Sequence, residues 1–392
     1  MSPFHLSADQ QEILDHADRF ARKALAPLAE PMDNTETWPD GLFETLGSAG
    51  FLGLTAPESL GGAGMDIFSA GLIGQAFSRH NPAVALSWGA HENLALHNLL
   101  RNGNDEQRAR FIPGMCAGTI VGALGLTEPG AGSDALGSMR TTAIRDGDRY
   151  RLNGRKLWIT NGPIADVVLV YAKTAPERGP RGISAFLVEK GTPGFSTGQK
   201  IRKMGYRGSP TGELIFEDAI VPARNRIGAE NAGVSVLMGG LDVERAFLAV
   251  TAVGMGERCL ELSLDYAQAR EQFGAPLASF QLIQAKLADM YVALETIRAL
   301  VYGVLSAFVG MEKGAAGRGP LHRLAAASIL HAGRAYKEIA DHAVQLHGGM
   351  GFGWEGEINR LYRCAKLMEI GAGTNEVRQI IIAEELLRDA AR

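Results

Sequence analysis

A block of strand-like sequence enclosed by two long helical blocks constrains this chain more than any other feature. In residues 141–222, short segments rich in β-branched and aromatic residues, such as DVVLVYA and ISAFLVE, alternate with polar turn signals. Before residue 118 and after residue 233, apolar residues recur at helical spacing instead. The pattern predicts an α+β, mainly α fold. We expect an N-terminal helical domain over residues 1–121, a mostly antiparallel β domain over 122–233 and a C-terminal helical domain over 234–392.

Several local signals predict where elements begin and end. Ser7, followed three residues later by Gln10, forms a capping box for a first helix, which we expect to end at Pro27. Asp146-Gly147 and Asn153-Gly154 are typical hairpin turns. Residues 313–319 (KGAAGRG) predict a flexible turn between two helices of the last domain.

The composition excludes several classes of partner. With 39 Lys plus Arg against 43 Asp plus Glu, the net charge of −4 supplies no basic field for nucleic acid or an anionic membrane. No apolar run approaches the roughly 20 residues of a membrane span, and the N-terminus lacks a signal pattern. The three cysteines match neither a disulfide framework nor a metal site. We expect a cytoplasmic protein; a mature mitochondrial matrix form would have the same appearance.

One motif match is misleading. Residues 351–356 (GFGWEG) fit the dinucleotide-binding pattern G-x-G-x-x-G. Such a site needs a strand before the glycines and a helix after them, because the glycines close the tight turn between the two. Residues 339–346 have helical periodicity, so we expect no dinucleotide site of this type. The sequence contains no P-loop motif and no zinc-type cluster.

Five short segments carry a stronger chemical signal. Residues 126–134 (LTEPGAGSD) form a glycine-rich loop whose backbone N–H groups can approach a flat polar ring or a pyrophosphate. The other four are WITNG (158–162), REQFG (270–274), QLHGG (345–349) and TNE (374–376). Taken singly, such strings are ordinary loops, strand-core aromatics or solvated helix ends. Five such segments in one fixed order are hard to obtain by chance.

In this order, the segments resemble the acyl-CoA dehydrogenase family of flavoenzymes over nearly the whole chain. The resemblance implies that a β domain lies between an N-terminal helical domain and a C-terminal four-helix bundle, and that the cofactor is FAD. It implies a cofactor site completed by a neighbouring subunit, and therefore a homotetramer built as a dimer of dimers. An acyl-CoA thioester is then the expected substrate and electron-transfer flavoprotein the expected partner.

The resemblance also assigns cofactor contacts residue by residue. Leu126 and Thr127 would meet the pyrimidine side of the flavin. Trp158 would pack near the isoalloxazine, and Thr160 would lie near its N5. Ser133, next to Gly132, would reach the FAD pyrophosphate or the CoA. Three residues would contact the FAD of a neighbouring subunit: Arg270, Phe273 and Gln281. Two further segments that resemble FAD-contacting segments of the family contain Gln345, Gly349, Thr374 and Glu376.

The candidate base is Glu244. Residues 367–378 (LMEIGAGTNEVR) carry Ala372 where sequences that they resemble often have a catalytic glutamate. Much earlier in the chain, Glu244 stands in GLDVERA. Read alone, a glutamate in a charged helix turn is usually a surface residue, but the missing carboxylate at position 372 favours Glu244. The isovaleryl-CoA dehydrogenase branch of the family has this arrangement, in which the backbone N–H of Ala372 would bind the thioester oxygen.

The same resemblance outlines an acyl and CoA path with room for a β-methyl branch beside Ala372. Ser235 and Trp88 stand where relatives often have tyrosine, and Glu92 also differs, so these positions leave the preferred chain length open. Contacts with the substrate are expected from eight residues: Ser133, Ser235, Asp242, Arg245, Leu248, Gly371, Ala372 and Gly373.

The expected reaction is FAD-dependent α,β-dehydrogenation of a short branched-chain acyl-CoA. Isovaleryl-CoA would be converted into 3-methylcrotonyl-CoA, as in leucine breakdown, with Glu244 removing the α-proton and FAD accepting the hydride. One alternative is a longer or differently branched substrate of the citronellyl type. Another is an acyl-CoA oxidase, in which reduced flavin reacts with oxygen. The third is a scaffold that has kept the fold and lost the chemistry.

Overall fold

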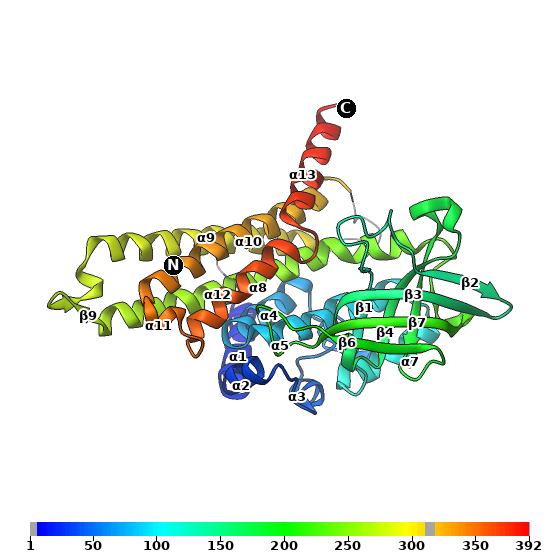
Figure 1. Cartoon of the computed structure of the whole chain (residues 1–392), viewed down its shortest axis with the longest axis horizontal. Coiled ribbons are helices and arrows are strands. Elements are labelled where there is room, and N and C mark those ends of the chain that lie inside the picture. The colour runs from blue at the N-terminus through cyan, green and yellow to red at the C-terminus, as the bar shows by residue number, and fades with distance from the viewer. Residues whose placement is uncertain (1–5, 310–317, 392) are drawn as a thin grey trace.

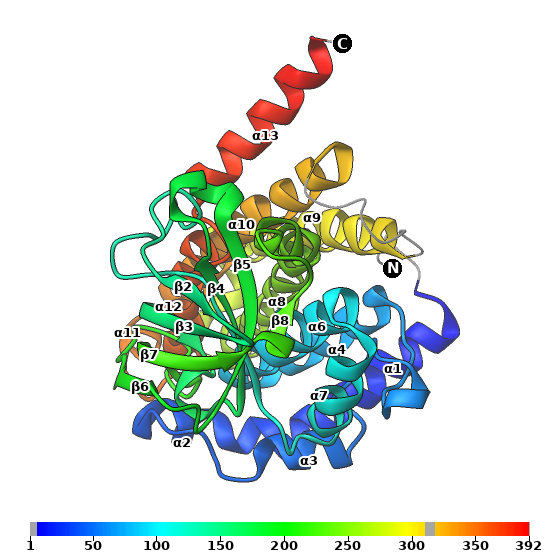
Figure 2. The same ribbon diagram turned by 90° about the vertical axis from the view of Figure 1, so that its right-hand side faces the viewer.

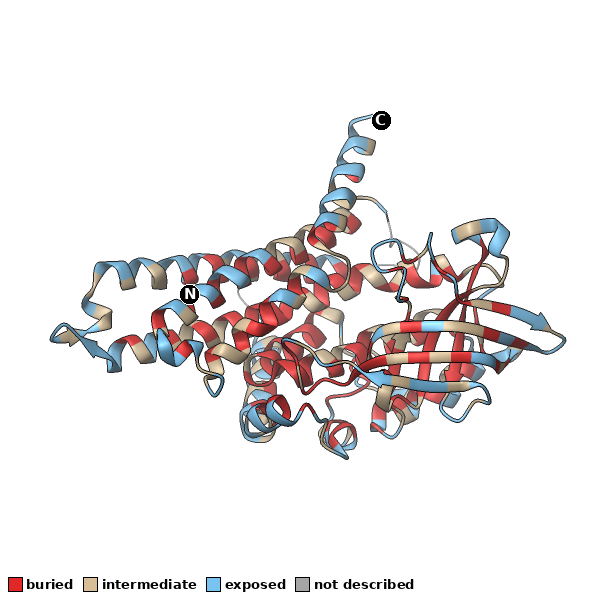
Figure 3. Ribbon diagram, viewed as in Figure 1, coloured by how far each residue is buried: buried red, intermediate tan, exposed pale blue. Residues whose placement is uncertain are grey.

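The chain forms N-terminal helices, a middle β-sheet and a C-terminal helical bundle, in that order (Figure 1). The computed structural model describes residues 6–309 and 318–391. Figure 2 shows the sheet beside both helical parts, with the last helix projecting away from them. Buried residues concentrate where the helices face one another and along the strands (Figure 3). The mainly helical α+β fold expected from the sequence is confirmed.

The N-terminal helix begins as predicted but does not end as predicted. α1 (Ala8–Phe20) starts with the capping box, in which the Ser7 hydroxyl accepts the Gln10 N–H at 3.2 Å. The helix continues through a π turn (Ala21–Leu25) into α2 (Ala26–Thr35), with Pro27 in its first turn. The expected end at Pro27 is therefore wrong. A proline is tolerated there because the first turn of a helix does not need its N–H.

The remaining elements of the N-terminal part are short helices and turns: α3 (Leu42–Ser48), a 3-10 turn (Glu58–Leu60), α4 (Ile67–His80), α5 (Pro82–Gly89), the π-helix η3 (Ala90–His97), α6 (Asn98–Asn102) and α7 (Asp105–Ala117).

The described middle residues form one sheet in the order β6-β7-β3-β2-β4-β5-β8, with β1 parallel to β4. Most neighbouring strands are antiparallel, as predicted. Three 3-10 turns, Gly162–Ile164, Pro176–Gly182 and Ala223–Asn225, connect strands. The strands are β1 (Gly122–Gly125), β2 (Thr142–Asp146), β3 (Arg149–Thr160), β4 (Val167–Lys173), β5 (Ile183–Glu189), β6 (Phe195–Lys200), β7 (Thr211–Pro222) and β8 (Arg226–Ile227).

The two predicted turn signals of the sheet have different outcomes. Asp146-Gly147 is the turn between β2 and β3, as expected. Asn153-Gly154 is not a turn: β3 runs through it, and its register against β7 shifts between Leu152 and Gly154. A Cβ on Gly154 would lie 2.5 Å from the Thr141 Oγ1, so this bulge requires glycine. The turn prediction is wrong because the partner strand decides between a turn and a bulge.

The C-terminal part is built on α8 (Gly233–Ala269), which packs with α9 (Gln281–Phe308), α10 (Pro320–His347) and α12 (Glu357–Ile370). α10 precedes the GFGWEG motif, so the helix expected over residues 339–346 is confirmed, and the motif does not follow a strand. The predicted turn at 313–319 lies mostly outside the described residues. The other elements are the hairpin β9 (Glu271–Gln272) and β10 (Ala275–Pro276), a 3-10 turn (Leu277–Ser279), α11 (Gly349–Phe352) and α13 (Asn375–Ala390).

Helix α9 departs from the expectation that no segment could span a membrane. Among the described helices, it alone has the length and apolar composition that such a crossing would need. In the structure, one face of α9 packs against α8 and α10, and Met290, Ile297 and Leu305 on this face belong to the bundle core. The core helix of a bundle meets the same criteria of length and composition.

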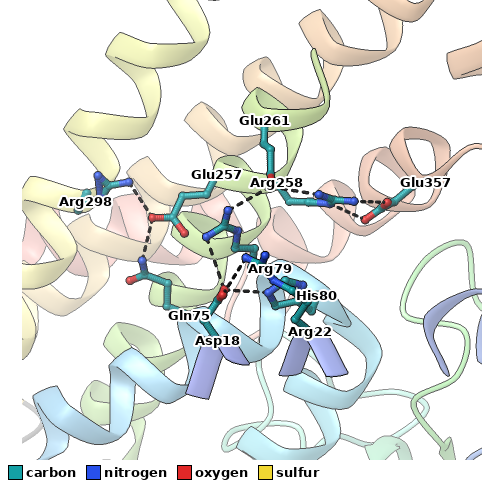
Figure 4. A network of polar contacts seen from close by, with 10 residues as sticks. All are labelled: Asp18, Arg22, Gln75, Arg79, His80, Glu257, Arg258, Glu261, Arg298 and Glu357. Atoms are coloured by element: carbon teal, nitrogen blue, oxygen red, sulfur yellow. Dashed lines mark hydrogen bonds and ion pairs between the residues drawn. The ribbon is translucent and has the colours of Figure 1, made fainter. Parts of the chain in front are cut away.

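A polar network ties α8 to the N-terminal helices (Figure 4). Arg79 on α4 bonds to Glu261 on α8 at 3.1 Å and lies 3.5 Å from Asp18 on α1. Gln75, also on α4, donates to Glu257 at 2.9 Å, and Glu257 in turn accepts from Arg298 on α9 at 2.8 Å. These contacts connect α1, α4, α8 and α9 and therefore fix the position of α8.

The close crossing of α8 and α4 gives the first testable prediction. A Cβ on Gly254 would lie 2.0 Å from the Gln75 carbonyl oxygen, so Gly254→Ala must push the two helices apart. We expect a loss of about 1–3 kcal/mol in the free energy of unfolding. The control is Gly303→Ala on α9, where a Cβ meets no atom within 4 Å. That change should be neutral or stabilising by up to about 1 kcal/mol. Urea unfolding of both variants tests the difference, and equal midpoints would contradict the crossing.

Candidate active site

Glu244 lies in the first half of α8, on a helix face that also carries Leu248 one turn later. Its side chain is half-buried and makes no hydrogen bond or ion pair within residues 6–309 and 318–391. Burial raises the pKa of this carboxyl from 4.5 to about 7, against the opposing charges of Arg245 and Arg378. A carboxyl with this pKa and no partner can take up a proton near neutral pH.

Two further predicted site residues on α8 are held in a buried cluster. The Asp242 Oδ1 accepts from the Arg245 Nη1 at 2.9 Å and lies 2.7 Å from the Nδ1 of His322, near the start of α10. All three side chains are buried. The cluster joins α8 to α10 directly beside Glu244. No sequence pattern indicates a role for His322, because its partner Asp242 is 80 residues away in the chain.

The segment after α12 has an unusual backbone. Gly371 ends the helix, and its N–H donates to the Leu367 carbonyl at 2.7 Å. Ala372 then has a φ of 55°, and Gly373 has a φ of 92°. A left-handed conformation costs a residue with a Cβ about 1 kcal/mol, so the surrounding structure must hold Ala372 in place. Ala372 and Leu248 are both partly buried and pack against the core of the helical bundle.

Arg378 holds this segment and was not predicted. It lies in the first turn of α13 and is fully buried. The Nη1 donates to the Met368 carbonyl at 2.7 Å and to the Asn375 Oδ1 at 3.0 Å, and the Nη2 donates to the Gly371 carbonyl. Burial, together with repulsion by Arg245, lowers the pKa of Arg378 to about 10. An arginine followed by apolar residues in a helix gives no hint that its partners are carbonyl oxygens.

The glycine-rich loop 126–134 is anchored by a buried ion pair that was also missed. The Lys156 Nζ on β3 donates to the Leu126 carbonyl at 3.0 Å and to the Glu128 carboxylate at 2.8 Å. Glu128 also accepts the N–H groups of Arg140, at 2.7 Å, and Thr141, at 3.0 Å. Burial lowers the pKa of Lys156 to about 8, although Glu128 opposes this shift. The sequence signal for this residue was a lysine directly before the apolar residues Leu157 and Trp158 of a strand.

The surface next to this loop fits a planar ring system. Trp158 has a φ of 64°, lies where the register of β3 shifts, and leaves 56% of its surface exposed. The Leu157 N–H donates to the Thr127 carbonyl at 2.8 Å, so loop and strand form one surface. A Cβ on Gly132 would meet no atom within 4 Å. An exposed indole in a strained conformation beside an open glycine loop offers an aromatic face for a flat cofactor.

The other predicted cofactor residues form a separate group. The hairpin β9–β10, the start of α9 and α11 lie at the end of the bundle opposite the sheet (Figure 1). Phe273, in the turn of that hairpin, is 96% exposed and has a φ of 57°. Within a single chain, these residues are therefore separated from the loop at 126–134. The exposed group consists of Arg270, Phe273, Gln281, Gln345 and Gly349, whereas Thr374 and Glu376 lie at the start of α13.

Three substitutions noted in the sequence have structural partners. The Trp88 indole donates to the Phe51 carbonyl at 2.7 Å and stacks on Phe247 with 5.3 Å between ring centroids. Glu92 is buried and accepts the backbone N–H groups of residues 53 and 54. Ser235 is exposed on the first turn of α8 and donates to the Ala232 carbonyl. Trp88 and Glu92 thus hold the same backbone segment, residues 51–54.

Three domain families match this chain from end to end. The N-terminal, middle and C-terminal domains of acyl-CoA dehydrogenase match residues 7–119, 123–219 and 231–387. The chain belongs to the acyl-CoA dehydrogenase family. Acyl-CoA dehydrogenases are FAD-dependent oxidoreductases.

Individual relatives show which members of the family this chain is similar to. Isovaleryl-CoA dehydrogenase of Oryza sativa is 42% identical over 382 residues, which are 97% of this chain and 91% of that protein. A 2-methylacyl-CoA dehydrogenase of Solanum tuberosum is 41% identical over 385 residues, which are 98% of this chain and 92% of that protein. The structure of butyryl-CoA dehydrogenase from Megasphaera elsdenii superimposes with a TM-score of 0.93 at 37% identity, covering 98% of this chain and 100% of the other.

The anchoring role of the Lys156–Glu128 ion pair in the glycine-rich loop 126–134 can be tested by Lys156→Met. This change leaves Glu128 buried without its cation and frees the Leu126 carbonyl, so the loop should loosen. We expect FAD to bind at least about tenfold more weakly, measured by titration of the apoprotein. Arg155→Met is the matched control, because the neighbouring Arg155 side chain is 58% exposed and its ion pair among the described residues is with Glu213. Equal FAD affinity in both variants would refute the anchoring role.

The raised pKa of Glu244 predicts a pH-dependent cost to stability. The folded pKa of about 7 lies above 4.5, so the protonated form contributes stability that is present below pH 4.5 and is lost as the pH rises through 7. Glu244→Gln should therefore raise Tm at pH 8, by an amount corresponding to about 1–3 kcal/mol, and leave it nearly unchanged at pH 5. Glu217→Gln, at an exposed position on β7, should show no such dependence. A constant difference across this range would contradict the buried-carboxyl assignment.

Proposed function

We propose that this protein catalyses FAD-dependent α,β-dehydrogenation of a short branched-chain acyl-CoA, with isovaleryl-CoA as the preferred substrate. The observation that carries the proposal is Glu244, on the helix beside the Ala372 segment. Its half-buried carboxyl has a pKa of about 7 and makes no hydrogen bond or ion pair with any residue that the structure describes. That segment has a methyl group and no carboxylate at position 372. The base of the reaction is therefore Glu244.

The chemistry needs three groups around the acyl thioester. Glu244 removes the α-proton, and the backbone N–H of Ala372 donates to the thioester oxygen, where negative charge develops. When bound, FAD accepts the hydride that leaves the β-carbon. Arg245 and Arg378 favour the carboxylate form of Glu244 because their charges lower its pKa. Substrate binding displaces water from this site and strengthens each of these interactions.

The small side chains at residues 371–373 support a branched acyl group. With side chains no larger than a methyl group at Gly371, Ala372 and Gly373, a β-methyl branch would find room there, and Leu248 would line the same pocket. The Oryza sativa relative is an isovaleryl-CoA dehydrogenase, which agrees with this substrate. The Solanum tuberosum relative is a 2-methylacyl-CoA dehydrogenase, so an α-methyl branch is the second candidate. Citronellyl-type chains remain the longer alternative. Ser133, Ser235, Asp242 and Arg245 are proposed CoA or acyl contacts.

The proposal extends to partners and setting. The exposed group at the far end of the bundle, with Phe273 at its tip, suits contacts with the FAD of a neighbouring chain in a homotetramer. Electron-transfer flavoprotein is the proposed acceptor, in the cytoplasm and in a leucine-breakdown pathway. The rival acceptor is oxygen, as in an acyl-CoA oxidase.

The test is an anaerobic visible spectrum of the purified flavoprotein before and after addition of isovaleryl-CoA. We expect the flavin band to bleach, at a rate that rises through about pH 7 as Glu244 loses its proton. Glu244→Gln should keep the flavin and reduce the bleaching rate by at least about 10³-fold. Asp265→Asn, at an exposed position on the same helix, should bleach normally.

Other outcomes separate the alternatives. Bleaching by a 2-methylacyl-CoA or by citronellyl-CoA, but not by isovaleryl-CoA, would reassign the substrate. Normal bleaching of Glu244→Gln would refute the base assignment. Hydrogen peroxide formed in step with turnover in air would identify an oxidase, and a flavoprotein that no acyl-CoA bleaches would indicate a scaffold.

A further inference from the structure

Arg378 occupies a position that is unfavourable for helix stability. It lies in the first turn of α13, where the helix dipole disfavours a cation, and its side chain is fully buried. The Nε–H has no partner among the described residues, so burial leaves one donor unsatisfied. These costs are offset by two backbone carbonyls, those of Met368 and Gly371, and by the Asn375 amide oxygen. The side chain is therefore placed to hold the end of α12.

The Gly371 carbonyl and the Ala372 N–H belong to the same peptide unit. Because a trans peptide is planar, its C=O and its N–H point in opposite directions. The guanidinium of Arg378 fixes the carbonyl end of this unit. The direction of the Ala372 N–H is thereby fixed as well.

The rest of the segment does not fix this peptide alone. Gly371 and Gly373 flank Ala372, and Ala372 itself has a φ of 55°, which a residue with a Cβ adopts reluctantly. The described capping contacts fix its two ends: the Gly371 N–H donates to Leu367, and the Thr374 hydroxyl accepts from Val377. Between these two ends, the described hydrogen bond to the Gly371 carbonyl comes from Arg378.

We propose that Arg378 is a positioning residue for the reaction, which aims the Ala372 N–H at the thioester oxygen by holding the Gly371 carbonyl. The inference rests on the proposed function, in which this N–H binds the thioester. Arginine suits the task because its planar fork presents two nitrogens in fixed directions and can hold two carbonyls at once. A lysine could reach one carbonyl but could not fix the plane of the peptide.

The test compares two ligands of the oxidised holoenzyme that differ in the thioester oxygen. One is 3-methylcrotonyl-CoA, which has the carbonyl, and the other is S-isopentyl-CoA, a thioether that lacks it. Flavin spectral changes give both dissociation constants. Wild type should prefer the carbonyl ligand, Arg378→Met should lose about tenfold of that preference, and Arg378→Lys should lose less. Affinity for the thioether should change little in any variant.

Arg363→Lys is the matched control. Arg363 is a buried arginine on α12 that also donates to a backbone carbonyl, that of Met204, and it pairs with Asp33. Its substitution should cost stability and leave the carbonyl preference unchanged. If Arg378→Met fails to retain flavin, the carbonyl preference of Arg378→Lys relative to wild type tests the inference instead. An unchanged preference in the Arg378 variants, with a clear preference in wild type, would overturn the inference.

Failure of the proposed function is distinguishable from failure of the inference. A wild type that binds both ligands equally would show that the Ala372 N–H does not contact the thioester, which removes the proposed oxyanion donor itself. Normal bleaching of Glu244→Gln would remove the proposed base without changing the carbonyl preference. Only a preference that is present in wild type and insensitive to Arg378 counts against the positioning role alone.

Discussion

Helix α8 is the constraint on which the structure depends. It contacts the N-terminal helices, the sheet and the bundle, and it carries Glu244. Its position is fixed by the close crossing with α4 at Gly254 and by the charged network around Glu257 and Arg79. A displacement of α8 would disturb all three parts of the molecule at once. The candidate base therefore lies on an element that all three parts of the molecule hold in place.

The site combines satisfied and unsatisfied polar groups. The Asp242 carboxylate bonds to Arg245 and His322 in a buried cluster, although the Arg245 Nε finds no partner among the described residues. Glu244 on the same helix has no hydrogen bond or ion pair among the described residues. Leaving a carboxyl in this state costs stability, and the fixed cluster beside it prevents the helix from relaxing to relieve that cost. Desolvation is thus concentrated at the carboxyl that we propose as the base.

Sequence patterns predicted features whose causes are local. The Ser7 capping box and the turn at Asp146-Gly147 depend on neighbouring residues, and both are confirmed. Asn153-Gly154 resembles that turn in sequence, but it is a bulge because β7 pairs with β3 along its length. Lys156 and Arg378 were missed because their partners include backbone carbonyls, which no residue pattern identifies. Glu244 was proposed as the base through the family resemblance alone, since its own helix turn has the sequence of an ordinary surface.

The left-handed backbone at Ala372 has a consequence for how such an enzyme can diversify. A long acidic side chain at this position would have to perform chemistry from a strained loop whose shape also limits the acyl group. With the proposed base on the regular backbone of α8, the base and the loop at residues 371–373 can vary independently. Substitutions that enlarge or narrow the acyl pocket at residues 371–373 then need not alter the acid–base group. In this arrangement, substrate range can evolve without a change in the proposed acid–base group.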